Sequence, residues 1–165
     1  MSRAFVNEDA LPEDVVERPI SNHPNYVTAE GLRHIERALE AAREAHGAAQ
    51  VSGDRSELAK ASSDLRYWSA RRASARILKP DPSRQTVQFG STVTIVRDGR
   101  RQTFQIVGED EADPSKGKLS YVSPLAREIM NKEVGDTAML GANKIEVVAA
   151  FADEMVSDHA ADRSD

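Results

Sequence analysis

The sequence predicts an α+β chain, in which an N-terminal antiparallel helical hairpin precedes an antiparallel sheet domain with one helix. Two observations support this prediction: a change in the period of the apolar residues and a proline-containing segment at the point of change. Apolar residues recur every three or four positions over residues 28–79, as in helices, and then at every second position over residues 84–153, as in half-buried strands. Between the two, Lys79-Pro80-Asp81-Pro82-Ser83 ends the helical part, because proline cannot continue a helix.

The composition indicates a soluble chain with a modest core. Of the 165 residues, 39% are hydrophobic, 5% are aromatic and 30% are charged, with a formal net charge of −5. That charge argues against wholesale non-specific binding to nucleic acid. The absence of cysteine excludes disulfides and thiolate metal sites. The sequence has no long apolar run or signal-peptide core, so we expect a cytoplasmic monomer with no membrane partner.

An extended leader is predicted over residues 1–27, either a disordered tail or a strap that packs on the body or on a partner. Thr28 is expected to cap the first helix, with Glu30 in its first turn. The hairpin of residues 28–79 should turn at Ser52-Gly53, and each helix carries a narrow apolar seam of the coiled-coil kind. The seam residues are Leu32, Ile35, Leu39, Ala42, His46 and Ala49 on the first helix and Leu58, Ala61, Leu65, Trp68, Arg72 and Ala75 on the second, where Arg72 is a flaw.

The sheet domain is expected over residues 84–153. Asp98-Gly99 is a strong hairpin turn between two alternating segments. Ser123 should cap a short helix that has proline in its first turn, and a last hairpin should follow over residues 137–151. Residues 154–165 then form a polar tail.

Two charged stretches leave alternatives open. Arg66, Arg71 and Arg76 lie off the seam of the second helix, where they form either a solvated face or a patch that faces phosphate. The acidic loop Glu109-Asp110-Glu111-Ala112-Asp113 invites a calcium hypothesis, but it lacks the ligand pattern of an EF-hand loop. A solvated loop is therefore expected, and the four histidines show no metal-ligand spacing.

Two carboxylates, Asp54 and Glu57, mark the turn of the predicted hairpin. One interpretation is a capping box, in which Asp54 accepts from the backbone of residue 57 and Glu57 reaches back. The other is that both carboxylates are ligands for Mg²⁺, which prefers carboxylate and water oxygens. Two carboxylates alone make a weak site, so the second interpretation requires further ligands from a partner.

Four segments in order carry a resemblance to a known family. They are Phe89-Gly90-Ser91-Thr92-Val93, Ile106-Val107-Gly108-Glu109-Asp110-Glu111-Ala112-Asp113, Ser123-Pro124-Leu125-Ala126-Arg127 and Lys132-Glu133-Val134-Gly135-Asp136. On these segments the chain resembles the bacterial Gre-type transcript cleavage factors, and Ser21–Thr28 is similar to the leader of GreB-like members. The resemblance implies an FKBP-like domain at residues 84–153 that binds RNA polymerase. It also implies that the coiled coil enters the secondary channel of the polymerase.

The resemblance further implies the roles of individual residues. Asp54 and Glu57 match the tip motif, so they would share the second Mg²⁺ of the polymerase and assist it in cleaving backtracked RNA. The chain would bind no cofactor alone and would not itself be an enzyme. Its partners would be RNA polymerase, the RNA 3′ end and DNA within the complex. The expected RNA-facing residues are Arg66, Arg71 and Arg76, and the expected polymerase-binding residues are Ser123, Pro124, Leu125 and Arg127.

Two departures from the family pattern favour an alternative function. Leu58 stands where typical members carry asparagine. Each arm is shorter by roughly eight to ten residues, or roughly 12–15 Å of helix. The alternative is a secondary-channel regulator that binds polymerase and inhibits or occludes it without stimulating cleavage. Two weaker alternatives are a coiled-coil adaptor and a prolyl isomerase, whose pocket would need the aromatic residues Phe89, Phe104, Tyr121 and Phe151.

Overall fold

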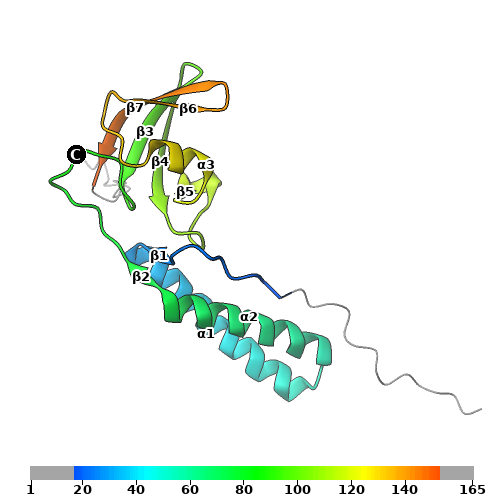
Figure 1. Cartoon of the computed structure of the whole chain (residues 1–165). Coiled ribbons are helices and arrows are strands. Elements are labelled where there is room, and N and C mark those ends of the chain that lie inside the picture. The colour runs from blue at the N-terminus through cyan, green and yellow to red at the C-terminus, as the bar shows by residue number, and fades with distance from the viewer. Residues whose placement is uncertain (1–16, 153–165) are drawn as a thin grey trace, which may run out of the picture. The chain divides into compact units, whose positions relative to one another are not determined.

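The computed structural model describes residues 17–152, which form two compact units (Figure 1). The helical unit contains residues 17–24 and 33–74, and the sheet unit contains residues 25–32 and 75–152. Residues 1–16 of the predicted leader and the predicted tail of residues 154–165 lie outside the described residues. No helix within residues 17–152 is long and apolar enough to cross a membrane.

Two helices form the predicted hairpin (Figure 1): α1 covers Ala29–Ser52 and α2 covers Arg55–Ser74. Thr28 caps α1 as predicted, because its Oγ1 accepts a 2.9 Å hydrogen bond from the N–H of Gly31. The second helix ends at Ser74 and does not continue to the predicted Lys79. The chain becomes extended there because strand β2 (Arg76–Ile77) pairs in parallel with strand β1 (Tyr26–Val27).

The predicted seam is well buried on α1 and less so on α2. Ile35 is fully buried at the centre of the α1 seam. Among the predicted seam residues of α2, only Ala61 is buried, while Leu58, Leu65 and Trp68 keep intermediate exposure. The other buried seam residues of α1 are Leu39, Ala42 and Ala49. The buried aliphatic side chains of α1 therefore contribute more to the packing of the hairpin than Trp68 of α2 does.

The second half of α2 departs from a simple seam. Arg72 remains 46% exposed, and its Nε lies 3.0 Å from Oε1 of Glu36, so the flaw is resolved by an ion pair at the edge of the seam. The ring of Trp68 packs edge-on against His34, with 5.8 Å between ring centroids. Arg71, one position before the flaw, is the side chain that becomes buried.

The last part of the leader, residues 17–24, belongs to the helical unit and contacts α2. The guanidinium carbon of Arg18 lies 3.9 Å from the ring centroid of Tyr67 and 5.1 Å from that of Trp68, within cation–π range. Oε1 of Glu17 lies 2.6 Å from a guanidinium nitrogen of Arg66. Residues 17–24 therefore form a strap that packs on the body, which is one of the two alternatives predicted for the leader.

A five-stranded sheet forms the body of the sheet unit, in the order β5-β4-β3-β7-β6. The β3–β4 hairpin turns at Asp98 and Gly99 with φ of 54° and 72°, as a two-residue turn of this sequence requires. The sheet is mixed, whereas the sequence predicted an antiparallel one, because β5 pairs in parallel with β4. The long loop after β4, which contains the 3-10 turn η1 (Pro114–Lys116), carries the chain back so that β5 runs in the same direction. The strands are β3 (Thr92–Arg97), β4 (Arg100–Val107), β5 (Lys118–Ser120), β6 (Thr137–Leu140) and β7 (Asn143–Phe151).

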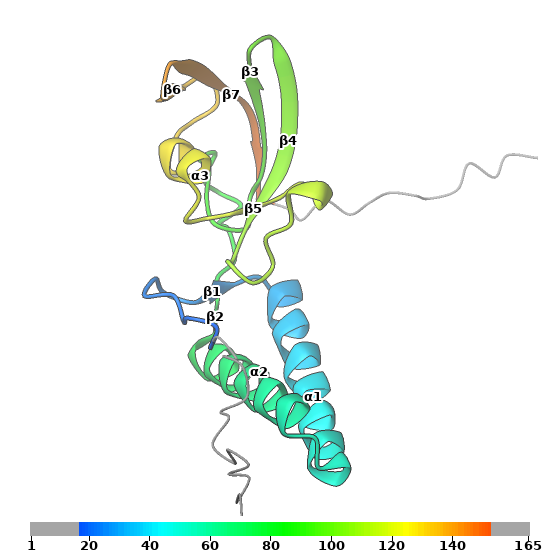
Figure 2. The same ribbon diagram turned by 90° about the vertical axis from the view of Figure 1, so that its right-hand side faces the viewer.

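One face of this sheet packs on helix α3 (Pro124–Ile129), as Figure 2 shows. Alternation with a period of two places every second strand residue on that face, and Val93, Ile95 and Ile106 there are fully buried. The same core contains Val87, Phe104, Ile129, Ala138, Ile145 and Val147. The opposite face carries polar side chains, among them Thr94 and Thr103, whose hydroxyls lie 2.8 Å apart.

Candidate functional site at the hairpin tip

The tip of the hairpin, residues 51–57, is formed by the end of α1 and the start of α2. Gly53 adopts φ of +72°, a left-handed conformation that favours glycine, and its N–H donates to the carbonyl of Ala49 at 3.1 Å. No atom lies within 4 Å of the Cβ that another residue would add at Gly53, so the backbone conformation alone selects glycine. The turn therefore closes α1 and leaves the following residue free to begin α2.

Asp54 begins α2 as its N-cap. Its Oδ1 accepts hydrogen bonds from the N–H groups of Ser56 at 2.9 Å and Glu57 at 3.1 Å. This half of the predicted capping box is confirmed. Within residues 17–152 no donor bonds to the other oxygen, Oδ2, and the whole residue is exposed.

Glu57 does not complete the capping box. The N–H of Asp54 donates to Oγ of Ser52 at 3.3 Å, so the serine takes the place predicted for the Glu57 carboxylate. Oε2 of Glu57 instead lies 3.5 Å from Oγ of Ser52, at the limit of a hydrogen bond. Glu57 is therefore exposed and loosely held. The sequence pattern missed Ser52 because this hydroxyl acts across the turn from the end of the preceding helix.

The tip presents two exposed carboxylates of the type that binds hard cations. Asp54 can cap its helix through Oδ1 and still offer Oδ2, so capping and metal binding do not exclude one another. Among the described residues, no group of three or more histidine, aspartate or glutamate side chains is arranged to hold a metal. Asp54 and Glu57 therefore fit a cation only as two ligands of a set that a partner completes.

The three arginines predicted to face RNA phosphate do not share one surface. Arg66 is exposed on α2 and pairs with Glu17. Arg71 is only 2% exposed, so the prediction of a phosphate-facing side chain is wrong for it. Arg76 lies in β2 and belongs to the sheet unit, not to the second helix. Helical spacing did not reveal that α2 ends at Ser74, before Arg76, or that other segments of the chain bury Arg71.

The residues predicted to bind polymerase lie at the start of α3. Oγ of Ser123 accepts a 3.3 Å hydrogen bond from the N–H of Ala126, so this side chain caps the helix as expected. Leu125 packs against the core, whereas Pro124 and Arg127 are exposed. Of the four residues, Pro124 and Arg127 therefore offer accessible side chains to a partner.

The acidic loop is not simply solvated. The side chain of Glu111 is 5% exposed, with Oε2 bonded to the Thr28 hydroxyl at 2.6 Å and Oε1 3.3 Å from Nζ of Lys118. Asp113 caps η1, and the hydrogen bond from the hydroxyl of Ser115 is the main cause that lowers the pKa of this carboxyl. Protein donors engage the carboxylates of Glu111 and Asp113, so these two residues are structural elements of the sheet unit. Within residues 17–152, no group of three or more histidine, aspartate or glutamate side chains is arranged here to hold a metal.

The aromatic residues needed by the prolyl isomerase alternative do not line one cavity. Phe89 and Tyr121 pack on each other and on Tyr26, with ring centroids 5.6–6.1 Å apart. Phe104 is 8% exposed in the core, and Phe151 lies at the end of β7. These rings fill space among themselves, which argues against a proline pocket in this unit.

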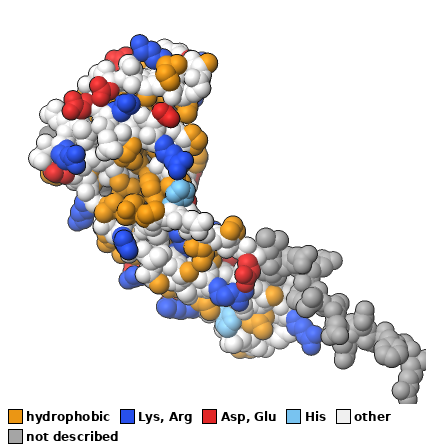
Figure 3. Space-filling view, viewed as in Figure 1, with side chains coloured by type: hydrophobic (Ala, Val, Ile, Leu, Met, Phe, Trp, Pro, Cys, Tyr) orange, Lys and Arg blue, Asp and Glu red, His pale blue; other side chains and the backbone are white. Residues whose placement is uncertain are grey.

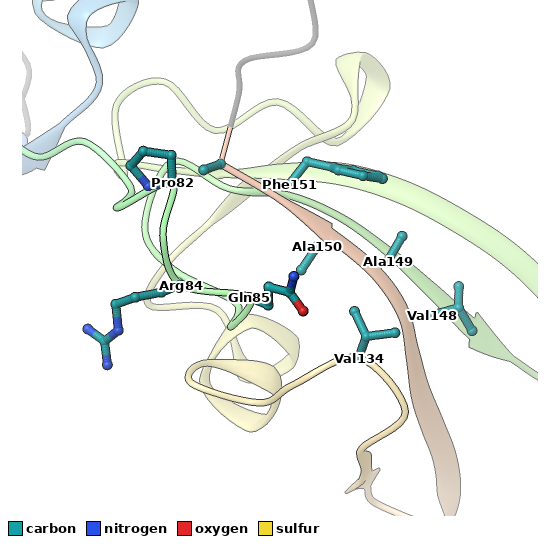
Figure 4. Close-up of a pocket in the computed structure, with 9 residues that line it drawn as sticks. Pro82, Arg84, Gln85, Val134, Val148, Ala149, Ala150 and Phe151 are labelled. Carbon is teal, nitrogen blue, oxygen red and sulfur yellow. The ribbon is translucent and has the colours of Figure 1, made fainter.

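A groove of about 420 Å³ runs beside the end of β7 (Figure 4). Val134 and Phe151 stand at it with 52% and 61% of their surfaces exposed, and Arg84 is the one charged residue in its lining. The remaining lining residues are Pro82, Gln85, Val148, Ala149, Ala150 and Ala152. Exposed apolar groups of this kind are typical of protein contact surfaces. The groove was not predicted from the sequence, although the unbroken apolar run at the end of β7 is a signal for it.

The fold and the tip together define a class of protein: a helical hairpin with exposed tip carboxylates, joined in one chain to a small sheet unit with a single covering helix. Residues 81–150 match the family described as "Transcription elongation factor, GreA/GreB, C-term". These residues are therefore similar to the C-terminal domain of GreA/GreB factors, and the resemblance to Gre-type factors is confirmed over this part of the chain.

Individual relatives agree with this family. The chain is 53% identical over 62 residues to "Transcription elongation factor GreA" of Maricaulis maris, a match that covers 36% of this chain and 40% of the relative. It is 38% identical over 92 residues to "Transcription elongation factor GreB" of Neisseria meningitidis, covering 52% and 56%. The chain thus spans about two fifths to just over half the length of these relatives. Among solved structures, GreA factor homolog 1 (Gfh1) of Thermus thermophilus is 23% identical with a TM-score of 0.37, over 76% of this chain and 97% of that one.

Proposed function

We propose that the chain is a transcription elongation factor that binds RNA polymerase and stimulates cleavage of backtracked RNA through its hairpin tip. The observation that carries this proposal is the pair of exposed carboxylates, Asp54 and Glu57, on the turn of a hairpin in a chain with a GreA/GreB C-terminal domain. The names of the relatives support the coarser part, a role in transcription elongation. The chain itself would not be an enzyme, and its place of action would be the cytoplasm.

The chemistry at the tip follows from the geometry of the two carboxylates. Oδ2 of Asp54 and the loosely held carboxylate of Glu57 are ligands that suit Mg²⁺ supplied by the polymerase. When bound, that metal would polarise phosphate oxygens and lower the pKa of a bound water. The chain contributes negative charge and positioning. Its helices keep the two carboxylates one turn apart at the end of arms that measure about 36 Å for α1 and about 30 Å for α2.

We assign polymerase binding mainly to the sheet unit and describe it as FKBP-like, with a curved sheet covered by α3. The match of residues 81–150 supports this assignment, as do the exposed Pro124 and Arg127. The hairpin would then enter the secondary channel and meet the RNA 3′ end. Because Arg71 is buried and Arg76 lies in the sheet unit, Arg66 is the one of the three expected arginines that α2 could still offer to RNA phosphate.

The test is RNA shortening by purified RNA polymerase stalled on a backtracked transcript, with and without the chain. Asp54→Asn and Glu57→Gln should each abolish stimulation while binding to polymerase stays intact. Asparagine caps helices as well as aspartate, so the first change removes charge without removing the cap. Asp64→Asn is the matched control, since it removes one carboxylate of α2 away from the tip. If both tip variants stimulate as well as wild type, the tip carboxylates have no chemical role.

The shorter arms favour one alternative: a secondary-channel regulator that binds polymerase and occludes it. The same assay separates the two functions, because this alternative predicts no RNA shortening at any concentration that saturates binding. In that case the chain should instead slow nucleotide addition. Asp54→Asn and Glu57→Gln would then leave the inhibition largely unchanged if occlusion is steric.

A further inference from the structure

One end of the sheet carries a cluster of cations that the proposed function does not use. The basic edge, as we name it, consists of Arg97 at the end of β3, Arg100 and Arg101 at the start of β4, and Lys144 in β7. The strand register places Arg97 directly opposite Arg100 and beside Ile145, so Lys144 follows at the same end of the sheet. Because successive strand residues alternate in face, Arg97 and Arg100 share one face at this end, and Arg101 and Lys144 share the other. Figure 3 shows lysine and arginine side chains at the top of the view, where Figure 1 places the β3–β4 turn.

The cations of the basic edge have no ion-pair partner among the described residues. None of the four lies within 4.0 Å of a carboxylate oxygen of residues 17–152. Some other cations of the described residues do form ion pairs, for example Arg72 with Glu36 and Lys118 with Glu111, whereas Arg84 and Lys116 lie within that distance of no carboxylate oxygen of residues 17–152 either. What distinguishes the basic edge is therefore that four such cations lie at one end of the sheet. The acidic residues nearest by register are Asp98 in the turn and Glu146 in β7, so the edge keeps an excess of positive charge in a chain of net charge −5.

The pairing of Arg97 with Arg100 is unfavourable for the fold alone. Side chains directly opposite in an antiparallel pair have Cβ atoms about 4.5–5.5 Å apart, and like charges there destabilise the hairpin. A bound anion would remove that repulsion. Three of the four cations are arginines, whose planar guanidinium groups form paired hydrogen bonds with phosphate oxygens. Arg100, Arg101 and Lys144 are exposed, and Arg97 is partly exposed, so all are accessible.

We infer that the basic edge binds the phosphate backbone of nucleic acid. The contact is electrostatic and independent of base sequence, because cationic side chains make it to phosphate oxygens and not to base edges. It is also separate from the tip chemistry, since it belongs to the sheet unit. The affinity is expected to be weak and to fall steeply with salt.

Binding of fluorescently labelled nucleic acid to the full chain, followed by fluorescence anisotropy, tests this inference. Single-stranded RNA and duplex DNA are the two probes, and the tighter one identifies the source of the phosphates. With three to four phosphate contacts, the logarithm of the RNA affinity should fall with a slope of about −2 to −3 against the logarithm of salt. Between about 50 and about 150 mM salt, that slope corresponds to a loss of about 10- to 30-fold.

A pair of double variants isolates the basic edge. Arg100→Gln with Arg101→Gln should weaken RNA binding and make the slope shallower by about 1.4. Arg84→Gln with Lys116→Gln removes the same charge from exposed positions elsewhere in the unit and should leave the slope unchanged. The melting temperature of the Arg100→Gln variant should stay level or rise, because repulsion with Arg97 is relieved, which separates lost binding from lost folding.

Two results would overturn the inference. One is equal RNA binding by the two double variants. The other is a labelled polyglutamate peptide that binds wild type as tightly as RNA does and loses affinity in the same variant, which would assign the edge to an acidic protein partner. Because no polymerase is present, the outcome does not depend on whether the chain stimulates cleavage.

Discussion

The hydroxyl of Thr28 donates a 2.6 Å hydrogen bond to Oε2 of Glu111, a residue 83 positions later in the chain. Oγ1 of Thr28 also accepts from the N–H of Gly31, so one threonine both caps α1 and binds the acidic loop. A Cβ at Gly31 would lie 2.5 Å from Oε2 of Glu111, and glycine there leaves room for the contact. Lys118 completes the cluster, with Nζ 3.3 Å from Oε1 of Glu111 and 3.2 Å from Oε1 of Glu30. The start of α1 is thereby part of the sheet unit.

Glu111→Ala should destabilise the sheet unit. The change leaves the Thr28 hydroxyl without its acceptor and removes a buried charge partner of Lys118. We expect a loss of about 1.5–3 kcal/mol in the free energy of unfolding, as for a hydrogen bond to a charged group. Urea unfolding followed by the amide signals of β3 measures it. Glu128→Ala, an exposed glutamate of α3, is the control, and equal midpoints for the two variants would contradict the prediction.

Lys118 should make the stability of the sheet unit depend on alkaline pH. Burial lowers the pKa of this amine, but the hydrogen bond to Glu30 and the charge of Glu111 outweigh burial and raise it above 10.5. A raised folded-state pKa contributes stability that is fully present below pH 10.5 and is lost as the pH rises through the folded pKa. The melting temperature should therefore fall above pH 10.5, and Lys118→Met should reduce this dependence.

The fold could be predicted where local patterns determine it. The change from a helical to an alternating period indicated a helical part and a sheet part, although α2 ends at Ser74 and residues 25–32 belong to the sheet unit. Asp98-Gly99 and Ser123 identified a turn and a cap. The parallel pairings of β5 with β4 and of β1 with β2 were not predicted. Such pairings join segments far apart in sequence, and three- or two-residue strands carry too little alternation to reveal them.

At the candidate site too, features set by local sequence were predicted and features set by contacts with other segments were not. The cap at Asp54 follows from residue type and position, and the structure confirms it. The partner of Glu57 did not follow, because Ser52 competes for the same backbone N–H. The burial of Arg71 also lies beyond local pattern, since a helical period assigns a face but not the segments that pack on it. Glu111 looked like part of a charged loop because its partner Thr28 is distant in sequence.

Two glycines near the tip should respond to alanine in opposite directions. Gly47 lies inside α1 with no atom within 4 Å of an added Cβ, so Gly47→Ala should stabilise the hairpin by about 0.5–1 kcal/mol. Gly53 has the same open space but φ of +72°, so Gly53→Ala should destabilise it by about 1–2 kcal/mol. Thermal unfolding followed by circular dichroism measures both. A shift of the same sign for the two variants would show that the left-handed turn is not retained in solution.

The hairpin should depend on Ile35 more than on Trp68. Ile35 is fully buried, so Ile35→Ala should cost about 2–5 kcal/mol. Trp68 keeps intermediate exposure, so Trp68→Ala should cost less than the roughly 3–5 kcal/mol of a buried tryptophan. Loss of helical signal in urea compares the two. If Trp68→Ala were the more damaging change, the cation–π contact with Arg18 would have to stabilise the hairpin more than its exposure suggests.

Ser52 should act as a positioning residue for the tip, a prediction that rests on the proposed function. Its Oγ donates to the carbonyl of Ala49 at 3.1 Å, accepts from the N–H of Asp54 at 3.3 Å and lies 3.5 Å from Oε2 of Glu57. A hydroxyl has one proton, so the bond to Ala49 and the bond to Glu57 alternate. Ser52 therefore limits where the Glu57 carboxylate goes without fixing it in one place.

Ser52→Ala should reduce the maximal rate of RNA shortening by about 2- to 12-fold, the equivalent of one hydrogen bond of 0.5–1.5 kcal/mol. The loss should be smaller than that of Asp54→Asn, because Ser52→Ala leaves both carboxylates in place. Ser52→Thr retains the hydroxyl and should restore most of the rate, whereas Ser69→Ala, on the exposed surface of α2, should have no effect. Binding to polymerase should be unchanged in all three variants. If Ser52→Ala and wild type shorten RNA equally while Glu57→Gln is inactive, Glu57 reaches its working position without the serine.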